Sequence, residues 1–453
     1  MNSTFSDFCH NIGLSEASAV QIQKASRQRT VGDTDEGSRI HSFCIAAQLS
    51  LGSEKVDVPP SQTCIAEPGC IVLPHTSNDV SKIMKIINFF DVKFAIRSGG
   101  HSPNPGWSSI GSEGVLLDMQ KMNHVSLSSD NLVATVGPGA RWGEVIAAIS
   151  PRRVAVVGGR IPIVGVAGLL LGGGYSYLTG EFGTAADSVK NYEVVLADGS
   201  IVHANGDENS DLFWALKGGG PNFGVITRFD LFTVSISDVW YEIMLYTPDQ
   251  AFHVLDAFAQ WQQDKDFDIK SSVTLSIGLD IITVALLYST PTDPPSCFKP
   301  FYAVQPAQVA VPSTNGTSAQ VYEMAYGVVS SEPMRHHVAA NVADFGRSRG
   351  GNPMGIPQRA HQWWTTLADW REAKDDELVR SVTIETTQQW KKLGIQRGSY
   401  LPFTFMNDAS RDQNPLASYG ADNLSKLKVI SRKYDPSQLL QRLQVGGFLL
   451  LRA

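Results

Sequence analysis

The stretch GVAGLLLGGG (residues 165–174) is the longest of three glycine clusters in the chain, and it decides the predicted fold. Two further clusters, SGGH at 98–101 and KGGGPNFG at 217–224, flank it in the sequence. Each cluster lies beside a strand candidate, and glycine clusters after strands let backbone N–H groups approach an anion, most often phosphate. A single cluster is as often a tight turn. Three in series predict a large cofactor that carries phosphate.

The spacing of these glycines excludes the commoner nucleotide and hydrolase motifs. Gly137-Pro138-Gly139 has no glycine three residues further on, so the Rossmann dinucleotide fingerprint is absent. No glycine-rich loop ends in Gly-Lys-Ser or Gly-Lys-Thr, which excludes a P-loop. The stretch GWSSIG (residues 106–111) has Ile110 where the hydrolase elbow needs glycine. Nicotinamide binding, ATP binding and ester hydrolysis all become less favoured.

Composition sets broader limits on the protein. The 453 residues are 43% hydrophobic and 18% charged, which predicts a sizeable buried core. The formal net charge of −7 argues against nucleic acid or an anionic membrane as a partner. The longest apolar run, 164–171, is far shorter than a bilayer span. The first twenty residues lack a secretory pattern, which is in favour of an intracellular location, but the compartment stays undecided. The 5 cysteines show no metal-ligand spacing, so no metal site is expected.

Periodicity and turn residues divide the chain into two regions of different composition. Residues 97–231 hold more than half of the 40 glycines between short β-rich runs, whereas 234–400 are richer in tryptophan and longer strands. Helices are expected at 78–90, 211–216, 252–263, 362–372 and 423–434. Strands are expected at 92–97, 115–118, 132–136, 193–196, 225–229, 273–277 and 281–288, with a hairpin turn at 197–200.

The glycine clusters, with the segments that follow them, resemble the berberine bridge enzyme-like flavoproteins of the vanillyl-alcohol oxidase superfamily. The resemblance also rests on DLFWAL (211–216), NFGVIT (222–227), and the closing segments KYDP (433–436) and GGF (446–448). It implies an α+β fold, with a two-subdomain FAD-binding domain and an inserted substrate domain of antiparallel sheet covered by helices. The implied division is 1–233 for the first part of the FAD domain, 234–400 for the substrate domain, and 401–453 for the segment that returns to the FAD domain.

The resemblance implies that FAD is the cofactor and that His101 is linked covalently to its 8α-methyl group. A second link, made by cysteine in many relatives, is not expected because Ile161 stands at that position. Val164 corresponds to the residue that gates oxygen access, and valine favours an oxidase. The full set of residues expected to bind FAD is His101, Arg97, Ser98, Gly99, Gly100, Ser102, Val164, Gly165, Gly168, Gly172, Gly173, Gly174, Tyr175, Asp187, Ile226 and Asn407.

The general base is less well marked in the sequence. Relatives carry a Tyr-x-Asn-type motif on the strand that returns from the substrate domain. In FTFMND (403–408), Asn407 fits the asparagine, but Phe405 replaces the tyrosine. Asp408 and Tyr400 are the nearest titratable groups and are the two candidate catalytic residues. The substrate domain adds Tyr246, Glu323 and Tyr326, which the sequence does not rank, and the pair at 336–337 (HH) is expected to be a solvated loop.

The resemblance implies an FAD-linked oxidase that transfers a hydride from a small organic substrate, such as a secondary metabolite, to the flavin. Molecular oxygen would then be the second substrate, and hydrogen peroxide the second product. Two alternatives stay open, namely an isomerase or cyclase that uses flavin as a scaffold, and a carbohydrate oxidase. Cys44 and Cys70 stand where many relatives have a disulfide, although reduced thiols are the alternative in an intracellular protein.

Overall fold

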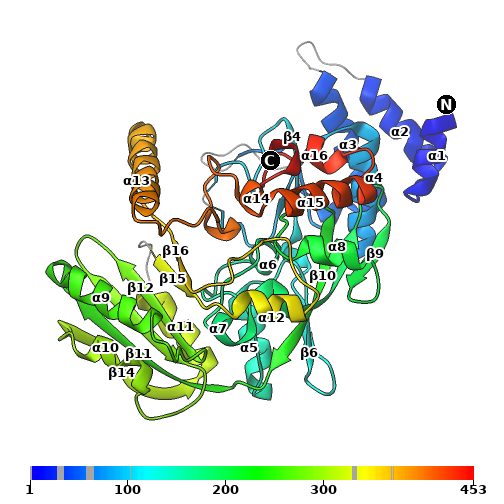
Figure 1. Cartoon of the computed structure of the whole chain (residues 1–453). Coiled ribbons are helices and arrows are strands. Elements are labelled where there is room, and N and C mark those ends of the chain that lie inside the picture. The colour runs from blue at the N-terminus through cyan, green and yellow to red at the C-terminus, as the bar shows by residue number, and fades with distance from the viewer. Residues whose placement is uncertain are drawn as a thin grey trace.

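The computed structural model describes residues 3–27, 35–57, 66–102, 104–328, 334–368, 370 and 372–453. Its described strands form three sheets, seen in Figure 1 as one sheet beneath helices at the lower left and two in the body at the right. The architecture is therefore α+β, as the sequence predicted.

The first sheet has four strands in the order β1-β2-β4-β3, of which the last three are parallel. Helix α4 packs beside it and begins at a capping box, in which the Asp79 backbone N–H donates to the Thr76 hydroxyl and the Thr76 N–H donates to the Asp79 carboxylate. The predicted helix at 78–90 is thereby confirmed. The elements are β1 (Val56–Asp57), β2 (Cys70–Val72), β3 (Lys93–Arg97), β4 (Gly114–Asp118), α1 (Ser3–Asn11), α2 (Glu16–Arg27), α3 (Asp35–Leu51) and α4 (Ser77–Phe90).

The second sheet is antiparallel, with the order β5-β6-β10-β8-β9 and β7 paired to β10. The predicted hairpin is present, since Val195 pairs with Ile201 across the turn. The elements are β5 (Val125–Leu127), β6 (Val133–Val136), β7 (Ala155–Val156), β8 (Val189–Val195), β9 (Ile201–Asn205), β10 (Val225–Val234), α5 (Trp142–Ile149), α6 (Val166–Leu171), α7 (Thr179–Phe182) and α8 (Ser210–Leu216).

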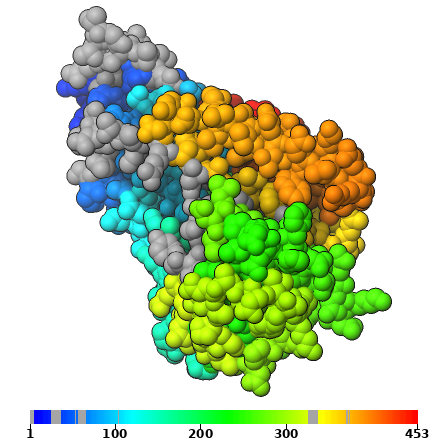
Figure 2. Space-filling model, turned by 90° about the vertical axis from the view of Figure 1, so that its left-hand side faces the viewer, coloured from blue at the N-terminus to red at the C-terminus, as the bar shows by residue number. Residues whose placement is uncertain are grey.

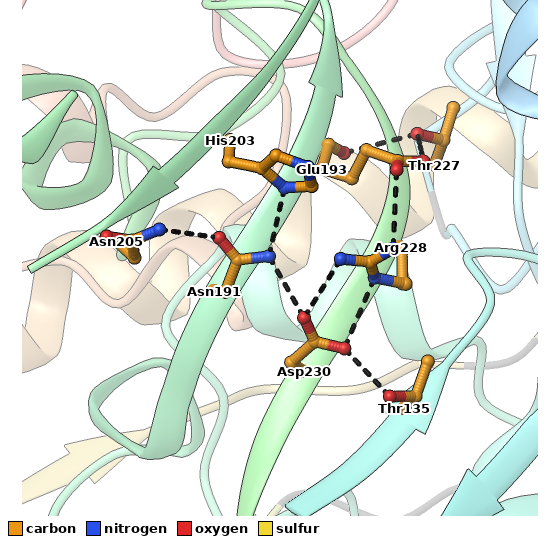
Figure 3. Close-up of polar contacts among 8 residues, drawn as sticks. All are labelled: Thr135, Asn191, Glu193, His203, Asn205, Thr227, Arg228 and Asp230. Atoms are coloured by element: carbon orange, nitrogen blue, oxygen red, sulfur yellow. Dashed lines mark hydrogen bonds and ion pairs between the residues drawn. The ribbon is translucent and has the colours of Figure 1, made fainter. Parts of the chain in front are cut away.

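The middle of this second sheet carries a polar network on one face. Figure 3 shows its centre, where the Asp230 carboxylate accepts hydrogen bonds from the Thr135 hydroxyl (2.8 Å) and the Asn191 amide (2.9 Å). Arg228 lies 3.3 Å from the same carboxylate. Tyr192 and Val194 are buried in the main hydrophobic core. Alternation along the middle of β8 thus separates the polar network from the main core, while Val195 at the end of the strand is buried in a second hydrophobic cluster.

The third sheet is antiparallel throughout, with the order β14-β11-β13-β12-β15-β16. Helices α9 and α10 contribute to the core on one of its faces, around Trp240 and Phe258. The elements are β11 (Asp238–Tyr246), β12 (Ser271–Ile277), β13 (Ile282–Tyr288), β14 (Gln308–Thr317), β15 (Met334–Val338), β16 (His361–Trp364), α9 (Ala251–Gln262), α10 (Lys299–Tyr302), α11 (Ser318–Val328) and α12 (Val342–Ser348).

The predicted helix at 362–372 is wrong. Residues 361–364 form β16, whose residue Trp363 pairs with His336 of β15, and no helix follows before residue 373 in the described part of this segment. The pairing buries Trp363, which is 5% exposed, whereas Trp364 points to the other face. Tertiary pairing at the sheet edge therefore decides a segment whose short apolar pattern is ambiguous.

The remaining helices belong to the C-terminal quarter of the chain. Helix α13 has no buried residue, and Figures 1 and 2 show it (orange) at the periphery of the molecule. No helix in the described residues is both long and apolar enough to cross a membrane. These elements are α13 (Asp376–Gln396), α14 (Pro415–Ser418), α15 (Ala421–Tyr434) and α16 (Leu439–Leu443).

A disulfide joins helix α3 to strand β2 through Cys44 and Cys70, which are 26 residues apart in the sequence. Of the two states considered for these cysteines, the structure has the bridged one. Cys9 and Cys297 are free, and Cys64 lies outside the described residues.

Replacing Cys44 by serine is expected to lower the free energy of unfolding by about 3 to 4 kcal/mol, because the bridge closes a loop of this length and restricts the unfolded chain. Chemical denaturation of the wild type with and without reductant provides the matched comparison. The reduced wild type should resemble the variant, and the variant should not respond to reductant. Equal stability of the oxidised wild type and the variant would contradict this role of the bridge.

Candidate functional site: two glycine loops and a buried cation

The first and second glycine loops lie against each other. A Cβ placed on Gly99 would stand 2.5 Å from the backbone nitrogen of Gly165, and one on Gly165 would stand 2.4 Å from that of Gly99. Any side chain at either position would push the loops apart. The two loops, which are far apart in sequence, thus form one continuous surface. They can approach this closely only because both positions are glycine.

Polar contacts of Arg97 and Ser98 stabilise the first glycine loop. The Arg97 guanidinium lies 2.5 Å from the Asp118 carboxylate, across the paired ends of β3 and β4. The Ser98 hydroxyl donates to the Pro138 carbonyl at 2.6 Å. Both side chains, which were predicted at the site, therefore hold the loop in position.

The backbone of this loop is suited to an anion. In the described part of the chain, the N–H groups of residues 99–102 donate no hydrogen bond, and Gly100 and His101 are exposed. Gly100 has a φ of +70°, which glycine adopts without strain. Successive free N–H groups on a loop of this kind are a phosphate-binding arrangement. The residues present therefore fit the pyrophosphate of a dinucleotide such as FAD.

Asn104, three residues after His101, is hydrogen-bonded to the C-terminal segment. The Asn104 side chain donates to the Ala409 carbonyl at 3.3 Å and accepts from the Arg411 N–H at 2.8 Å. The loop that carries His101 is thereby brought beside residues 407–411, although they are some three hundred positions apart in sequence. No sequence signal indicated Asn104, because its contacts form only in the folded chain.

Asn407 holds the second glycine loop. Its side-chain oxygen accepts a hydrogen bond from the Gly174 N–H at 2.9 Å, and its amide donates to the Gly168 carbonyl at 3.1 Å. A Cβ on Gly172 would stand 2.3 Å from the Asn407 amide nitrogen, whereas one on Gly168 would have no atom within 4 Å. The structure therefore brings together Asn407 and the glycines predicted with it, and Gly168 faces open space.

Asp408 and Arg160 lie together next to this loop. Surrounding protein atoms raise the pKa of the Asp408 carboxyl, and the positive charge of Arg160 and a hydrogen bond from Thr365 act in the opposite direction. Asp408 is nevertheless exposed to solvent. The sequence predicted Asp408 but not Arg160, which precedes Ile161 directly.

Aromatic rings surround the Arg160 guanidinium. Its central carbon is 5.1 Å from the centre of the Tyr175 ring and 5.8 Å from that of Tyr177, while a nitrogen is 3.5 Å from the Thr274 hydroxyl of β12. The Tyr177 ring meets Tyr322 of α11 edge-on at 6.0 Å. The cation therefore lies between the second glycine loop and the third sheet.

Several other predicted residues belong to the core beside the site. Burial raises the pKa of Tyr175 to about 12, and its hydroxyl donates to the His337 carbonyl at 2.7 Å. Asp187 is completely buried and accepts hydrogen bonds from Thr184 and from Asn352. Val164 packs at the edge of the main core, and Ile226 is buried in β10.

Other titratable residues considered from the sequence lie elsewhere. Tyr400 is 37% exposed, and its backbone N–H donates to the Gly394 carbonyl of α13. Tyr246 is buried in the core that includes α9, and Glu323 is exposed on α11. The side chain of Tyr326 lies outside the described part. Asp408 is thus the candidate base that the structure places beside the glycine loops.

The expectation of a solvated pair at 336–337 is wrong. Both residues belong to strand β15, and His337 is 5% exposed. Its Nδ1 is 2.8 Å from the Gln262 amide, and burial lowers its pKa to about 3. His337 is therefore a neutral core residue on the α9 side of the sheet. The side chain of His336 lies outside the described part.

The third glycine cluster contains a buried lysine. Lys217 is 0% exposed, and its ammonium group donates to the Arg349 carbonyl at 2.6 Å and lies 4.0 Å from the centre of the Phe213 ring. Burial lowers its pKa to about 8, with Asp187 acting to raise it and Arg349 to lower it. The lysine thereby joins the KGGG cluster to the segment after α12.

Lys217 is expected to make stability depend on pH. Its folded pKa is below its unfolded pKa, so between about pH 8 and 10 the unfolded chain binds more protons and the free energy of unfolding rises with pH. Relative to Lys217→Met, the wild type should gain about 1 to 2 kcal/mol between pH 8 and 9.5 in chemical denaturation. If the free energy of unfolding changed with pH in the same way in both proteins, the lowered pKa of Lys217 would be contradicted.

Comparisons with known proteins agree with this arrangement. A family profile described as FAD binding domain matches residues 68–205. An FAD-dependent monooxygenase of Arthrobotrys oligospora is 38% identical over 430 residues, covering 86% of this chain and 84% of its own. The bifunctional solanapyrone synthase of Alternaria solani is 32% identical, covering 86% and 83%.

Solved structures show the same fold at lower identity. Glucooligosaccharide oxidase from Acremonium strictum, described with a 6-S-cysteinyl, 8α-N1-histidyl FAD, has a TM-score of 0.68 at 20% identity and covers 86% of this chain and 96% of its own. A berberine bridge enzyme-like protein from Physcomitrella patens has a TM-score of 0.69 at 19% identity and covers 93% and 97%.

The fold, the paired glycine loops and these relatives define an FAD-dependent oxidoreductase. More specifically, the chain belongs to the same family as these FAD-dependent relatives, and its fold is that of the vanillyl-alcohol oxidase-type and berberine bridge enzyme-like flavoproteins. Among the described residues, no group of three or more His, Cys, Asp or Glu side chains could hold a metal ion.

Proposed function

We propose that the protein oxidises a small organic molecule with an FAD that is attached covalently to His101, and that molecular oxygen is the second substrate. Bound FAD supplies the hydride acceptor for a substrate C–H bond, and its reoxidation by oxygen yields hydrogen peroxide. We divide the chain for this function into a cofactor part (1–233 and 401–453) and a substrate part (234–400).

The first support is the position of His101. It follows the free N–H groups of residues 99 and 100, so a pyrophosphate bound there would leave the histidine exposed toward the rest of the cofactor. The imidazole is a nucleophile able to form a bond to the 8α-methyl carbon. Ile161 has no nucleophile, so one covalent link is expected. Val164 is small and lies at the contact between the two loops, which favours access of oxygen.

The observation that carries the proposal is the contact between Asn407 and the second glycine loop. Asn407 is fixed by two hydrogen bonds to that loop, and the next residue, Asp408, is thereby held beside the cofactor-binding surface. A carboxyl group that burial drives toward the neutral form accepts a proton readily when it is ionised. We assign Asp408 as the base that removes the substrate O–H or N–H proton.

The test is peroxide release by the purified holoprotein. Wild type is supplied with panels of alcohols, phenols, amines and sugars in air, and peroxide is measured by a coupled peroxidase assay together with oxygen uptake. A substrate that gives one peroxide for each oxygen consumed supports the oxidase. If turnover of a substrate consumed no oxygen, an isomerase or cyclase would replace the oxidase as the function.

A monooxygenase is the second candidate, because several curated relatives carry that name. The same assay separates the two functions when it is run under ¹⁸O₂ with and without NADPH, because a monooxygenase needs two electrons to reduce the second oxygen atom to water. An oxidase leaves the label in peroxide, whereas a monooxygenase places one labelled oxygen atom in the product. Label in the product with no peroxide would overturn the oxidase proposal.

A further inference from the structure

Two asparagine side chains hold the segment 406–411 against the two glycine loops. Asn407 lies in that segment and binds the second loop by two hydrogen bonds. Asn104 lies three residues after His101 and binds the segment from the side of the first loop, also by two hydrogen bonds. Each side-chain amide uses both a donor and an acceptor. One short stretch of chain is thereby joined to both loops.

Asp408 lies between the points at which these two asparagines are attached. Asn407 precedes it directly. The Asn104 side chain donates to the Ala409 carbonyl at 3.3 Å and accepts from the Arg411 N–H at 2.8 Å. The backbone before Asp408 is therefore bound to the second glycine loop, and the backbone after it is bound to the segment that carries the first.

Asn104 is a buried part of the fold and not a surface side chain. It is 7% exposed, and its own backbone N–H donates to the Ser102 hydroxyl at 3.3 Å. Ala409, whose carbonyl it contacts, is buried as well. A buried amide costs free energy unless its donor and its acceptor are both paired. The two contacts with the segment 406–411 meet this requirement, so they define where that segment lies.

The proposed chemistry depends on the distance between two groups that lie on different segments. The flavin would be attached at His101, and the proposed base is Asp408, some three hundred positions further along the chain. A base removes a proton efficiently only from a defined position, and a misplacement of about 1 Å can cost about 100-fold in rate. Contacts between the two segments must therefore fix this distance, and Asn104 makes two of them.

Other groups that face Asp408 affect it in a different way. Arg160 and Thr365 interact with its carboxyl group, so they act on its charge. Asn104 instead contacts the backbone that follows Asp408, and it carries no charge of its own. Its influence on the carboxyl group is therefore one of position.

We propose, on the basis of the proposed function, that Asn104 is a positioning residue that fixes Asp408 relative to the flavin attached at His101. Asn104 takes no part in the proton transfer. It is not needed for FAD to bind or to become attached, because Arg97 and Ser98 hold the first glycine loop independently.

The test compares Asn104→Leu with Asn191→Leu, both as flavin-containing proteins. Leucine has nearly the size of asparagine and removes both hydrogen bonds. Asn191 is a matched control, because it is 8% exposed, accepts from the Asn205 amide at 3.0 Å and donates to Asp230 at 2.9 Å in the polar network of Figure 3. Both variants should lose thermal stability, and both should keep the flavin content and the covalent fraction of the wild type.

Hydrogen exchange of the purified proteins tests the contact without any substrate. In Asn104→Leu the Arg411 amide should exchange about tenfold faster than in the wild type, because it loses its acceptor, and the segment 406–411 should lose protection with it. Asn191→Leu should match the wild type over this segment. Unchanged exchange in Asn104→Leu would overturn the proposal.

A double-mutant cycle with Asp408→Asn tests the role in catalysis, using the substrate found in the peroxide assay. Asn104→Leu should lower the limiting rate of flavin reduction about 10- to 100-fold, and the dissociation constant of the substrate should stay within about threefold. In the Asp408→Asn background the same replacement should change the rate by less than about threefold, because no base is left to position. Asn191→Leu should keep the wild-type rate.

Equal fold losses in the two backgrounds would show a general structural effect and would overturn the proposal. An unchanged reduction rate in Asn104→Leu would overturn it as well. Failure of the proposed function gives different results. Full-rate reduction in Asp408→Asn would refute the proposed base, and a wild type without flavin would refute the proposed function itself.

Discussion

Replacing His101 by alanine is expected to abolish covalent flavin while some FAD still binds tightly. The alanine removes the imidazole that forms the covalent bond. It leaves the free N–H groups of residues 99–102, the contact of Gly99 with Gly165, and the hydrogen bonds of Asn407 to the second glycine loop. In acid-denatured samples separated on a gel, the flavin fluorescence of the protein band should fall to background. The native variant should stay yellow.

His253→Ala is the matched control, since His253 is exposed on α9 and far from the glycine loops in sequence. It should keep the full fluorescence of the wild-type band. Covalent flavin in His101→Ala would show that another residue makes the link. Loss of tightly bound FAD together with the covalent link would show that His101 is needed for binding and not only for attachment.

Replacing Asp408 by asparagine is expected to lower kcat by about 10²- to 10⁴-fold, the range associated with a general base. The amide has nearly the shape of the carboxylate but cannot accept the proton. Flavin content should not change, because the hydrogen bonds to the glycine loop come from Asn407 and not from Asp408. Stopped-flow reduction of the flavin by the substrate found in the peroxide assay measures the step directly.

The pH dependence of that step provides an independent test. Because burial raises the pKa of Asp408, flavin reduction in the wild type should slow as pH falls through a value above that of an ordinary aspartate. Asp408→Asn should lose this limb of the profile. Asp422→Asn, at an exposed position on α15, should keep both the rate and the profile. An unchanged rate in Asp408→Asn would assign the base to a different residue.

The sequence predicted the cofactor surface better than it predicted the substrate surface. Glycines 99, 165 and 172 could be predicted because a close contact there leaves no room for a Cβ. In the structure Gly99 and Gly165 approach each other's backbone, and Gly172 approaches the side chain of Asn407. Asn407 was found by its place in the returning segment. Each of these glycines meets a distant segment, but glycine clusters are visible in the sequence without knowledge of that partner.

Arg160 and Asn104 were missed because their roles depend on partners distant in the chain. Arg160 meets Thr274 across 114 positions, and Asn104 meets Arg411 across 307. An isolated arginine or asparagine carries no pattern of its own. The one signal in the sequence that could have indicated Arg160 is its place just before the proposed flavin loop.

The wrong or missing predictions between residues 234 and 400 also arise from contacts, or a lack of burial, that the sequence does not show. The run at 361–364 is strand because it pairs with β15 at the sheet edge, and α13 was not predicted because none of its residues is buried. A fully exposed helix lacks the sharp apolar stripe from which helices are recognised. The pair at 336–337 (HH) appeared polar in sequence, yet the strand places His337 under α9.

The most direct test of this account is the visible spectrum of the purified protein, followed by that of its acid-precipitated pellet and supernatant. We predict a flavin spectrum that stays with the pellet, and a flavin-bearing peptide that contains His101. Flavin released into the supernatant would contradict the covalent link and favour a weaker oxidant or an isomerase. A colourless protein that cannot be reconstituted with FAD would contradict the assignment of the glycine loops as the cofactor site.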